Sequence, residues 1–174
     1  MKHRLMKHST QPHTGFTLIE TLVAISILLI ALTAPLTIAS RGLSSAYFAR
    51  DQITAFYLAQ DAVEYIRNTR DQNVLTGSGW LSGIPDTDGA LFTVDTTDGD
   101  MALCPVSGCD PLLYNSTTNF YSYGDPSGTE SRFTRSVSID TLSADEAVIT
   151  VAVAWATGIL NRTFSVKENI LNWQ

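Results

Sequence analysis

One apolar stretch constrains this chain more than any other part of it. Residues 16–40 read FTLIETLVAISILLIALTAPLTIAS and carry a single charge, that of Glu20. A helix rises about 1.5 Å per residue, so this stretch forms about 36 Å of helix, enough to cross a hydrocarbon core about 30 Å thick. The stretch therefore predicts a membrane-spanning helix. The Glu20 carboxylate within this stretch calls for a functional explanation, because inserting a charge at the centre of a membrane span costs about 3 kcal/mol.

The charges on either side of the stretch predict its orientation. Residues 1–15 contain Lys2, Arg4 and Lys7 and no acidic residue, so the net charge of −6 becomes −9 once they are left out. A basic flank before the span and an acidic domain after it place the N-terminus in the cytoplasm and the remainder outside. The acidic exterior also argues against nucleic acid as a partner, because a polyanion is bound by clustered Lys and Arg.

The start of the apolar stretch resembles a known processing signal. Residues 15–20 read GFTLIE and lead into an apolar helix, which resembles the prepilin site of type IV pilins and type II secretion pseudopilins. The resemblance implies that a prepilin peptidase cuts between Gly15 and Phe16 and methylates the new amine of Phe16. It also implies that Glu20 faces the Phe16 amine of a neighbouring subunit during assembly. An ammonium is the partner that makes a buried carboxylate tolerable.

Two other interpretations compete for the same stretch. A secretory signal peptide has an apolar core of about 7–15 residues followed by a small-residue cleavage site. Here the run is longer, and residues 38–40 (Ile-Ala-Ser) form a mediocre site. An uncleaved signal anchor fits the composition well. Neither alternative explains Glu20, so we favour the prepilin interpretation.

The helical pattern continues beyond the span. Pro35 removes one helical hydrogen bond, so we expect a kink or a locally loosened segment there. Residues 41–73 predict an amphipathic continuation of the helix, because apolar residues recur at steps of three or four. This predicted stripe consists of Ile53, Phe56, Ala59, Val63 and Ile66. The polar residues largely off the stripe are interpreted as a solvated face, with contacts to neighbouring subunits as the alternative: Arg50, Asp51, Gln60, Asp61, Glu64, Arg67 and Arg70.

After residue 73 the composition changes to loops and strands. Residues 74–130 are rich in Gly, Asp, Ser and Thr, and only residues 90–95 and 101–104 read as short strands. From residue 131 onward the apolar pattern has a period of two, which predicts three sequential strands: residues 133–139, 147–155 and 162–167, the last extending to Ile170. We therefore predict an α+β, pilin-like fold, in which the long N-terminal helix packs on a C-terminal antiparallel β-meander.

The positions of the cysteines and histidines limit the disulfide, catalytic and metal-binding chemistry that we expect of this chain. Cys104 and Cys109 enclose four residues and, in an exported domain, predict a disulfide, with free thiols as the alternative. All three histidines, His3, His8 and His13, lie in the leader. The processed chain would therefore lack histidine-dependent catalysis and His-ligated zinc. We expect no enzyme activity.

Aspartates cluster in the Gly-containing loops of the head. Such carboxylates suit calcium, and the resemblance adds that some pseudopilins bind calcium in a region of this kind. A complete EF-hand pattern is missing, so we interpret these residues as turn formers and expect no cofactor, with calcium as the alternative. The residues are Asp86, Asp88, Asp95, Asp98 and Asp100.

The sequence as a whole predicts a structural filament subunit of the minor pilin or pseudopilin type. Residues 1–15 form the leader, residues 16–40 the transmembrane and assembly helix, residues 41–73 its continuation, and residues 74–174 the head. The implied partners are the prepilin peptidase, other pilin or pseudopilin subunits, and the inner membrane with its filament assembly machinery. The subunit would pass from a single-pass inner-membrane state to a periplasmic or extracellular filament. The alternative is a membrane-anchored extracellular binding domain that does not polymerise.

Overall fold

The computed structural model describes residues 15, 17–85 and 89–172. Its contacts divide the chain into a unit that ends at Ala46 and a unit that begins at Tyr47, and each is described separately. The predicted cleavage residue Phe16 and most of the leader lie outside the described residues. The elements are α1 (Leu18–Thr76), β1 (Phe92–Val94), β2 (Met101–Leu103), β3 (Leu113–Asn115), β4 (Phe120–Ser122), β5 (Thr129–Glu130), β6 (Phe133–Ser143), β7 (Glu146–Thr157) and β8 (Leu160–Leu171).

The first unit contains the apolar part of α1. This segment is long and apolar enough to cross a membrane, and its most apolar window is entirely unburied within the protein. Its hydroxyl groups are satisfied by the helix itself: Ser26 Oγ donates to the Leu22 carbonyl at 2.8 Å, and Thr37 Oγ1 donates to the Thr33 carbonyl at 2.9 Å. Such bonds keep polar side chains paired where no water is present.

Pro35 is accommodated within α1, which is continuous from Leu18 to Thr76. Because proline has no backbone N–H, the Ala31 carbonyl four residues earlier loses its helical donor. Membrane helices tolerate such a gap when neighbouring groups satisfy the carbonyl. The kink expected at this residue stays a prediction.

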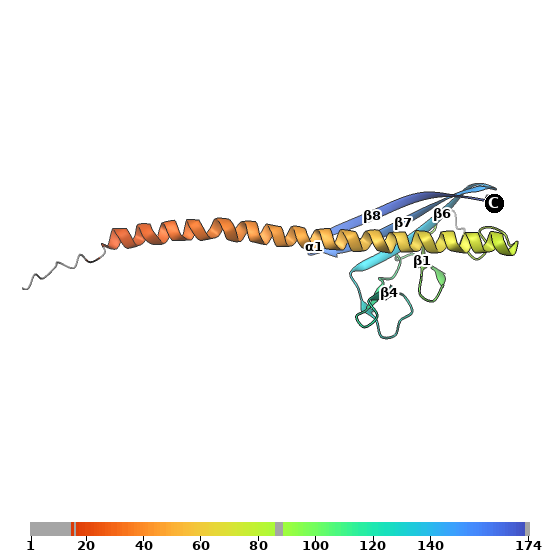
Figure 1. Cartoon of the computed structure of the whole chain (residues 1–174), viewed down its shortest axis with the longest axis horizontal. Coiled ribbons are helices and arrows are strands. Elements are labelled where there is room, and N and C mark those ends of the chain that lie inside the picture. The colour runs from red at the N-terminus through yellow and green to blue at the C-terminus, as the bar shows by residue number, and fades with distance from the viewer. Residues whose placement is uncertain (1–14, 16, 86–88, 173–174) are drawn as a thin grey trace, which may run out of the picture. The chain divides into compact units, whose positions relative to one another are not determined.

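The second unit is built on a five-stranded antiparallel sheet in the order β2-β1-β6-β7-β8. The three sequential strands predicted from the period-two pattern are confirmed as the meander β6-β7-β8. Phe133 on β6 lies opposite Trp155 on β7, and Thr157 on β7 lies opposite Leu160 on β8. These strands run alongside the C-terminal part of α1 (Figure 1). The predicted α+β layout, a long helix packed on antiparallel strands, is confirmed.

A second, three-stranded sheet in the order β4-β3-β5 was not predicted. Its strands have two or three residues each, too few for an alternating pattern to be visible in the sequence. Buried Leu112 links this sheet to the first one: its N–H donates to the Phe133 carbonyl, and its carbonyl accepts from the Ser131 N–H, both at 2.8 Å.

The core lies between α1 and the inward face of the large sheet. Alternate residues of β6 and β7, including Val137, Ile139, Val151 and Val153, are fully buried against it. The helix contributes a stripe that differs from the predicted one: Ala55, Leu58, Ala59, Ala62, Val63 and Ile66.

Two residues of the predicted stripe were wrongly placed. Ile53 is 57% exposed, and Phe56 is 47% exposed with its ring against that of Phe164 at 5.8 Å. The physical reason is that the sheet packs closely on small alanines such as Ala55 and Ala62, which a search for large apolar residues does not select. The buried stripe is consequently rotated around the helix from the predicted one.

Ile66→Ala should destabilise the head by about 2–5 kcal/mol, because it leaves a cavity in a packed core. Ile53→Ala is the matched control and should change the free energy of unfolding by less than about 1 kcal/mol, since exposed side chains contribute little. Urea unfolding of the full chain in detergent micelles measures both. Equal effects of the two substitutions would contradict the observed stripe.

Candidate functional site

The start of α1 is a capped helix terminus. The Glu20 N–H donates to Thr17 Oγ1 at 3.3 Å, and the Thr21 N–H donates to the Thr17 carbonyl at 3.2 Å. Thr17 and Glu20 have the Thr-x-x-Glu spacing of a capping box. A negative charge in the first turn also interacts favourably with the positive end of the helix dipole. Local structure therefore accounts for an acid here, but it leaves the carboxylate without a cation.

No side chain of the same segment can neutralise Glu20. Among residues 17–46, which the structure describes, only Glu20 and Arg41 are charged. They are 21 residues apart, which is about 31 Å along a helix. Glu20 is exposed on a helix whose neighbouring side chains Leu18 and Ile19 are exposed and apolar. A cation for this carboxylate must therefore come from outside residues 17–46.

Gly15, the predicted residue before the cut, is exposed. It precedes the first residue of α1, Leu18, by three positions, so the backbone there is not yet helical. A protease needs an accessible, non-helical backbone, and Gly15 is exposed and precedes the helix. The role of Gly15 and Phe16 in cleavage stays a prediction.

In the head, Arg135 ties three elements together, and sequence reasoning missed it. Its side chain is fully buried and donates to the Leu58 carbonyl on α1 at 2.9 Å, to Asp61 Oδ2 at 3.2 Å and to the Val94 carbonyl on β1. A buried guanidinium is tolerated only when its donors are used, and most of these are. The period-two pattern of β6 could have revealed it, because Phe133, Arg135 and Val137 share one face.

The interpretation of the helix charges as a solvated face was wrong for Asp51 and Arg70. Asp51 is 2% exposed and accepts from Arg132 at 3.0 Å and from Arg50 at 3.4 Å. The side chain of Arg70 is largely buried and donates to the Leu171 carbonyl. Both residues lie where α1 contacts the rest of the head, so each charge is paired instead of solvated.

Asp95 organises the loops that follow β1 and β4. It is 3% exposed and accepts from the Thr97 N–H and hydroxyl at 2.9 and 2.6 Å, and from the N–H groups of Tyr123 and Gly124 at 2.6 and 3.0 Å. Burial raises the pKa of Asp95, but these hydrogen bonds outweigh it and leave the pKa below its ordinary value. The Asp95 carboxylate therefore holds the two loops together through hydrogen bonds to their N–H groups, although no strand pairing in the described part of the chain joins them.

The structure gives no test of calcium binding. Asp86 and Asp88 lie outside the described residues, and the carboxylate of Asp95 already receives four hydrogen bonds from the protein. In the part of the chain that the structure describes, no group of three or more His, Cys, Asp or Glu side chains is placed to hold a metal. That these aspartates form turns and hold no cofactor, with calcium as the alternative, stays a prediction.

The structure joins Cys104 to Cys109 in a disulfide with a Cα–Cα distance of 4.7 Å. The small ring contains a tight turn, in which the Gly108 N–H donates to the Pro105 carbonyl at 2.9 Å. Gly108 has a φ of 112°, which favours glycine. The Cys104 N–H also donates to the Leu91 carbonyl at 2.9 Å, so the ring extends from the β1–β2 edge of the sheet.

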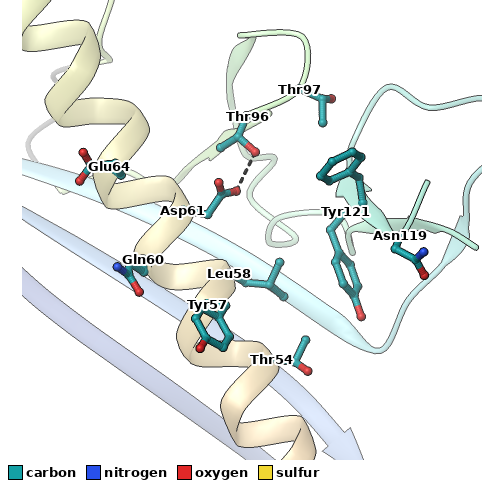
Figure 2. Close-up of a pocket in the computed structure, with 11 residues that line it drawn as sticks. Thr54, Tyr57, Leu58, Gln60, Asp61, Glu64, Thr96, Thr97, Asn119 and Tyr121 are labelled. Carbon is teal, nitrogen blue, oxygen red and sulfur yellow. Dashed lines mark hydrogen bonds between the residues drawn. The ribbon is translucent and has the colours of Figure 1, made fainter.

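An open groove of about 960 Å³ runs beside α1 (Figure 2). Residues 54–64 of α1 form one wall, and residues 96–97 and 119–121 form the other. Asp61 Oδ2 accepts from Thr96 at 2.7 Å across the groove, as Figure 2 shows. The groove is lined by hydroxyls, carboxylates, aromatic rings and the apolar side chain of Leu58.

The aromatic residues near this groove divide into two kinds. Tyr121 packs against Phe133 with ring centroids 6.0 Å apart, and Tyr123 donates its hydroxyl to the Arg135 carbonyl at 2.8 Å. Burial raises the pKa of both tyrosines, since it disfavours the phenolate. Phe120, by contrast, is 66% exposed. Most of this aromatic set therefore supports the fold, and Phe120 is left at the surface.

Asp95→Asn should destabilise the head at pH 7 by about 1–3 kcal/mol, because one of the two acceptor oxygens becomes an N–H₂ donor that faces N–H groups. A lowered folded-state pKa means that the stabilisation is complete above the ordinary value of 3.8 and is lost as the pH falls through the lowered pKa. The difference from wild type should therefore shrink below about pH 4. Urea unfolding between pH 3 and 7 measures it, with exposed Asp110→Asn as the control. A difference independent of pH would contradict this role.

The comparisons with known proteins bear on the start of the chain. Residues 12–34 match the family model of the prokaryotic N-terminal methylation motif. The match includes Gly15, Phe16 and Glu20 and most of the apolar part of α1. Searches of curated proteins and of solved structures found no match. The motif implies processing by a prepilin peptidase and assembly with other pilins, and the single apolar helix fits a single-pass inner-membrane anchor. The chain thus carries the prepilin signature of the type IV pilins and pseudopilins.

Proposed function

We propose that this chain is a structural subunit, a minor pilin or pseudopilin, of a type IV pilus or a type II secretion filament. The observation that carries the proposal is Glu20, a carboxylate without a cation in its own segment, one turn into an exposed apolar helix that begins at the methylation motif. Cleavage after Gly15 would create an ammonium at Phe16. That ammonium, on a neighbouring subunit, is the missing partner.

The apolar helix explains why such a subunit is stored in a membrane before it assembles. Side chains such as Leu22, Leu29 and Ile30 are more than half exposed. Burial of apolar surface is worth about 25 cal/mol per Å², so the helix needs lipid or other apolar helices around it. In a filament, neighbouring helices replace the lipid. Apolar contacts alone leave the axial position of each helix undefined, and one buried ion pair would fix it.

The head is suited to move with its helix. Arg135, the Asp51–Arg132 pair and the Arg67–Glu168 pair at 3.3 Å all join α1 to strands or loops of the head. Together with the shared core, these contacts make residues 47–172 one compact unit. Transfer of α1 from lipid into a filament would therefore carry the head without unfolding it.

The second candidate function is a membrane-anchored binding domain that does not polymerise. The groove beside α1 and the exposed Phe120 favour it, because they offer a surface that the fold itself does not use. This alternative shares the membrane anchor but gives Gly15 and Glu20 no function. Assembly assays on substitutions at these positions therefore distinguish the two candidates.

Glu20→Ala should reduce filament formation about tenfold or more, because the loss of about 1.4 kcal/mol per added subunit is already a factor of ten. Filaments sheared from a host with its assembly machinery, quantified by immunoblot and electron microscopy, measure the effect. Ser26→Ala is the matched control within the span, since the Ser26 hydroxyl bonds only its own helix, and it should assemble normally. Gly15→Leu should keep the leader and give no filament. Normal assembly of Glu20→Ala would exclude the ion-pair proposal.

A further inference from the structure

The edge strand β8 leaves one side of its backbone without a neighbouring strand. It is the last strand in the order β2-β1-β6-β7-β8, and among the described residues it pairs with β7 alone. Its register with β7 is unbroken from Leu160 to Leu171. The strand at the other edge of the sheet, β2, has three residues, whereas β8 has twelve. β8 therefore presents a long open edge.

The alternation of an antiparallel ladder shows which backbone groups face this open edge. The Asn172 N–H donates to the Asp145 carbonyl at 2.9 Å, in continuation of the β7–β8 ladder. Residues of β8 with even numbers therefore bond to β7, and residues with odd numbers direct their N–H and C=O groups away from it. The Leu171 carbonyl agrees with this alternation, because it accepts from the side chain of Arg70 on α1. The odd-numbered residues from 161 to 169 thus offer donors and acceptors to a further strand.

Two opposite charges lie on the α1 side of β8. The Arg162 guanidinium lies above the ring of Phe48, 4.2 Å from its centre, and Glu168 pairs with Arg67 at 3.3 Å. Phe48 and Arg67 both belong to α1, so both charges share one face of the sheet. Charges on an edge strand discourage pairing with a foreign strand unless that strand places opposite charges beside them.

A second copy of β8 places opposite charges there in one antiparallel register, which is centred on Ser165. In this register Arg162 lies opposite Glu168 of the second copy, and the same pair forms in the reverse direction. The apolar residues between the two charges also match, because Phe164 lies opposite Val166 of the second copy. A shift by two residues in either direction would place an apolar residue opposite Arg162 and leave both charges unpaired. The charges of β8 therefore select one register.

An apolar hollow beside the open edge also favours an added strand. Phe56 on α1 contacts Phe164 on β8 with ring centroids 5.8 Å apart, yet Phe56 is 47% exposed and Ile53 is 57% exposed. A strand paired with β8 would direct alternate side chains toward α1, where they would cover these two residues. The hollow measures about 450 Å³ and is lined by Ala49, Gln52, Ile53, Phe56, Tyr57 and Phe164.

We propose that β8 is a docking edge for a second copy of this chain, and that two heads join through antiparallel pairing of β8 with β8, centred on Ser165. The pairing would extend the five-stranded sheets of both heads into one continuous sheet. The parts of α1 that belong to the two heads would run in opposite directions. This contact is therefore distinct from the helix packing of the proposed function, and it does not depend on that function.

Disulfide trapping on the full chain in detergent micelles tests the pairing. Ser165→Cys places a thiol at the centre of the register, where facing Cα atoms are about 5.5 Å apart, a distance that a disulfide can bridge. Thr163→Cys is the matched control, because Thr163 and Ser165 are both exposed and share one face of β8. The two copies of residue 163 would be separated by four residues along the strand, about 13 Å. Oxidation is mild, and mass spectrometry checks that the Cys104–Cys109 disulfide stays intact.

We expect Ser165→Cys to form at least about tenfold more covalent dimer than Thr163→Cys on non-reducing gels. Adding Glu168→Arg to Ser165→Cys should remove most of this dimer, because like charges would then face each other. Adding Arg162→Glu as well should restore the dimer. The contacts that both side chains make with α1 stay lost in this last variant, so only pairing between copies explains a recovery.

The same experiment can overturn the proposal in four ways. No dimer from either cysteine variant would exclude the contact, and equal amounts from both would exclude the register. Failure of Arg162→Glu to restore the dimer would exclude the ion pairs that select this register. In the host cell, a cross-link from Ser165→Cys to a different protein would identify that protein as the occupant of the edge and exclude pairing between copies.

Discussion

The structure depends on one constraint: a single helix must be stable in two different surroundings, an apolar one along its first part and the head with solvent along its second part. Up to Ser40 the helix is apolar on every side, and nothing in its own unit covers it. From Asp51 onward one face is buried by the head, and the other carries most of the polar residues together with exposed Ile53 and Phe56. The first part can be stable in water only if something apolar surrounds it. Lipid and a bundle of apolar helices both meet that requirement, so the proposed storage in a membrane and the proposed assembly into a filament place the same demand on this segment.

The head shows how a loop-rich domain stays attached to such a helix. Its strands outside the meander are short, so they form few backbone hydrogen bonds. Hydrogen bonds from buried side chains hold these segments in place instead. Asp95 gathers the N–H groups of two loops, and Arg135 uses carbonyls of α1 and β1 that regular structure leaves available. Buried charges are costly unless they are hydrogen-bonded, so these positions tolerate few substitutions. The large sheet supplies most of the buried apolar surface, and the polar ties define where the loops lie.

The long apolar helix and the meander could be predicted because their patterns are long. An unbroken apolar run needs no partner to be recognised, and strands of eleven or twelve residues repeat their alternation several times. The short sheet β4-β3-β5 has no such repetition. The buried stripe differs from the predicted one because it contains alanines such as Ala55 and Ala62, and a search for large apolar side chains does not select them. Glu20 could be singled out from the sequence because a carboxylate in an apolar run is a local anomaly, whereas Gly15 was singled out by the resemblance to the prepilin site. Arg135 could not be assigned a role before its carbonyl partners, distant in the chain, were known.

The most direct test of the account is the intact mass of the protein purified from a host that has a prepilin peptidase. We expect a chain that begins at Phe16 and is heavier than that sequence by one methyl group. Such a chain has the N-terminal ammonium that Glu20 requires. A full-length chain, or a chain cut after the apolar run, would contradict the account and would indicate an anchored or a secreted domain instead.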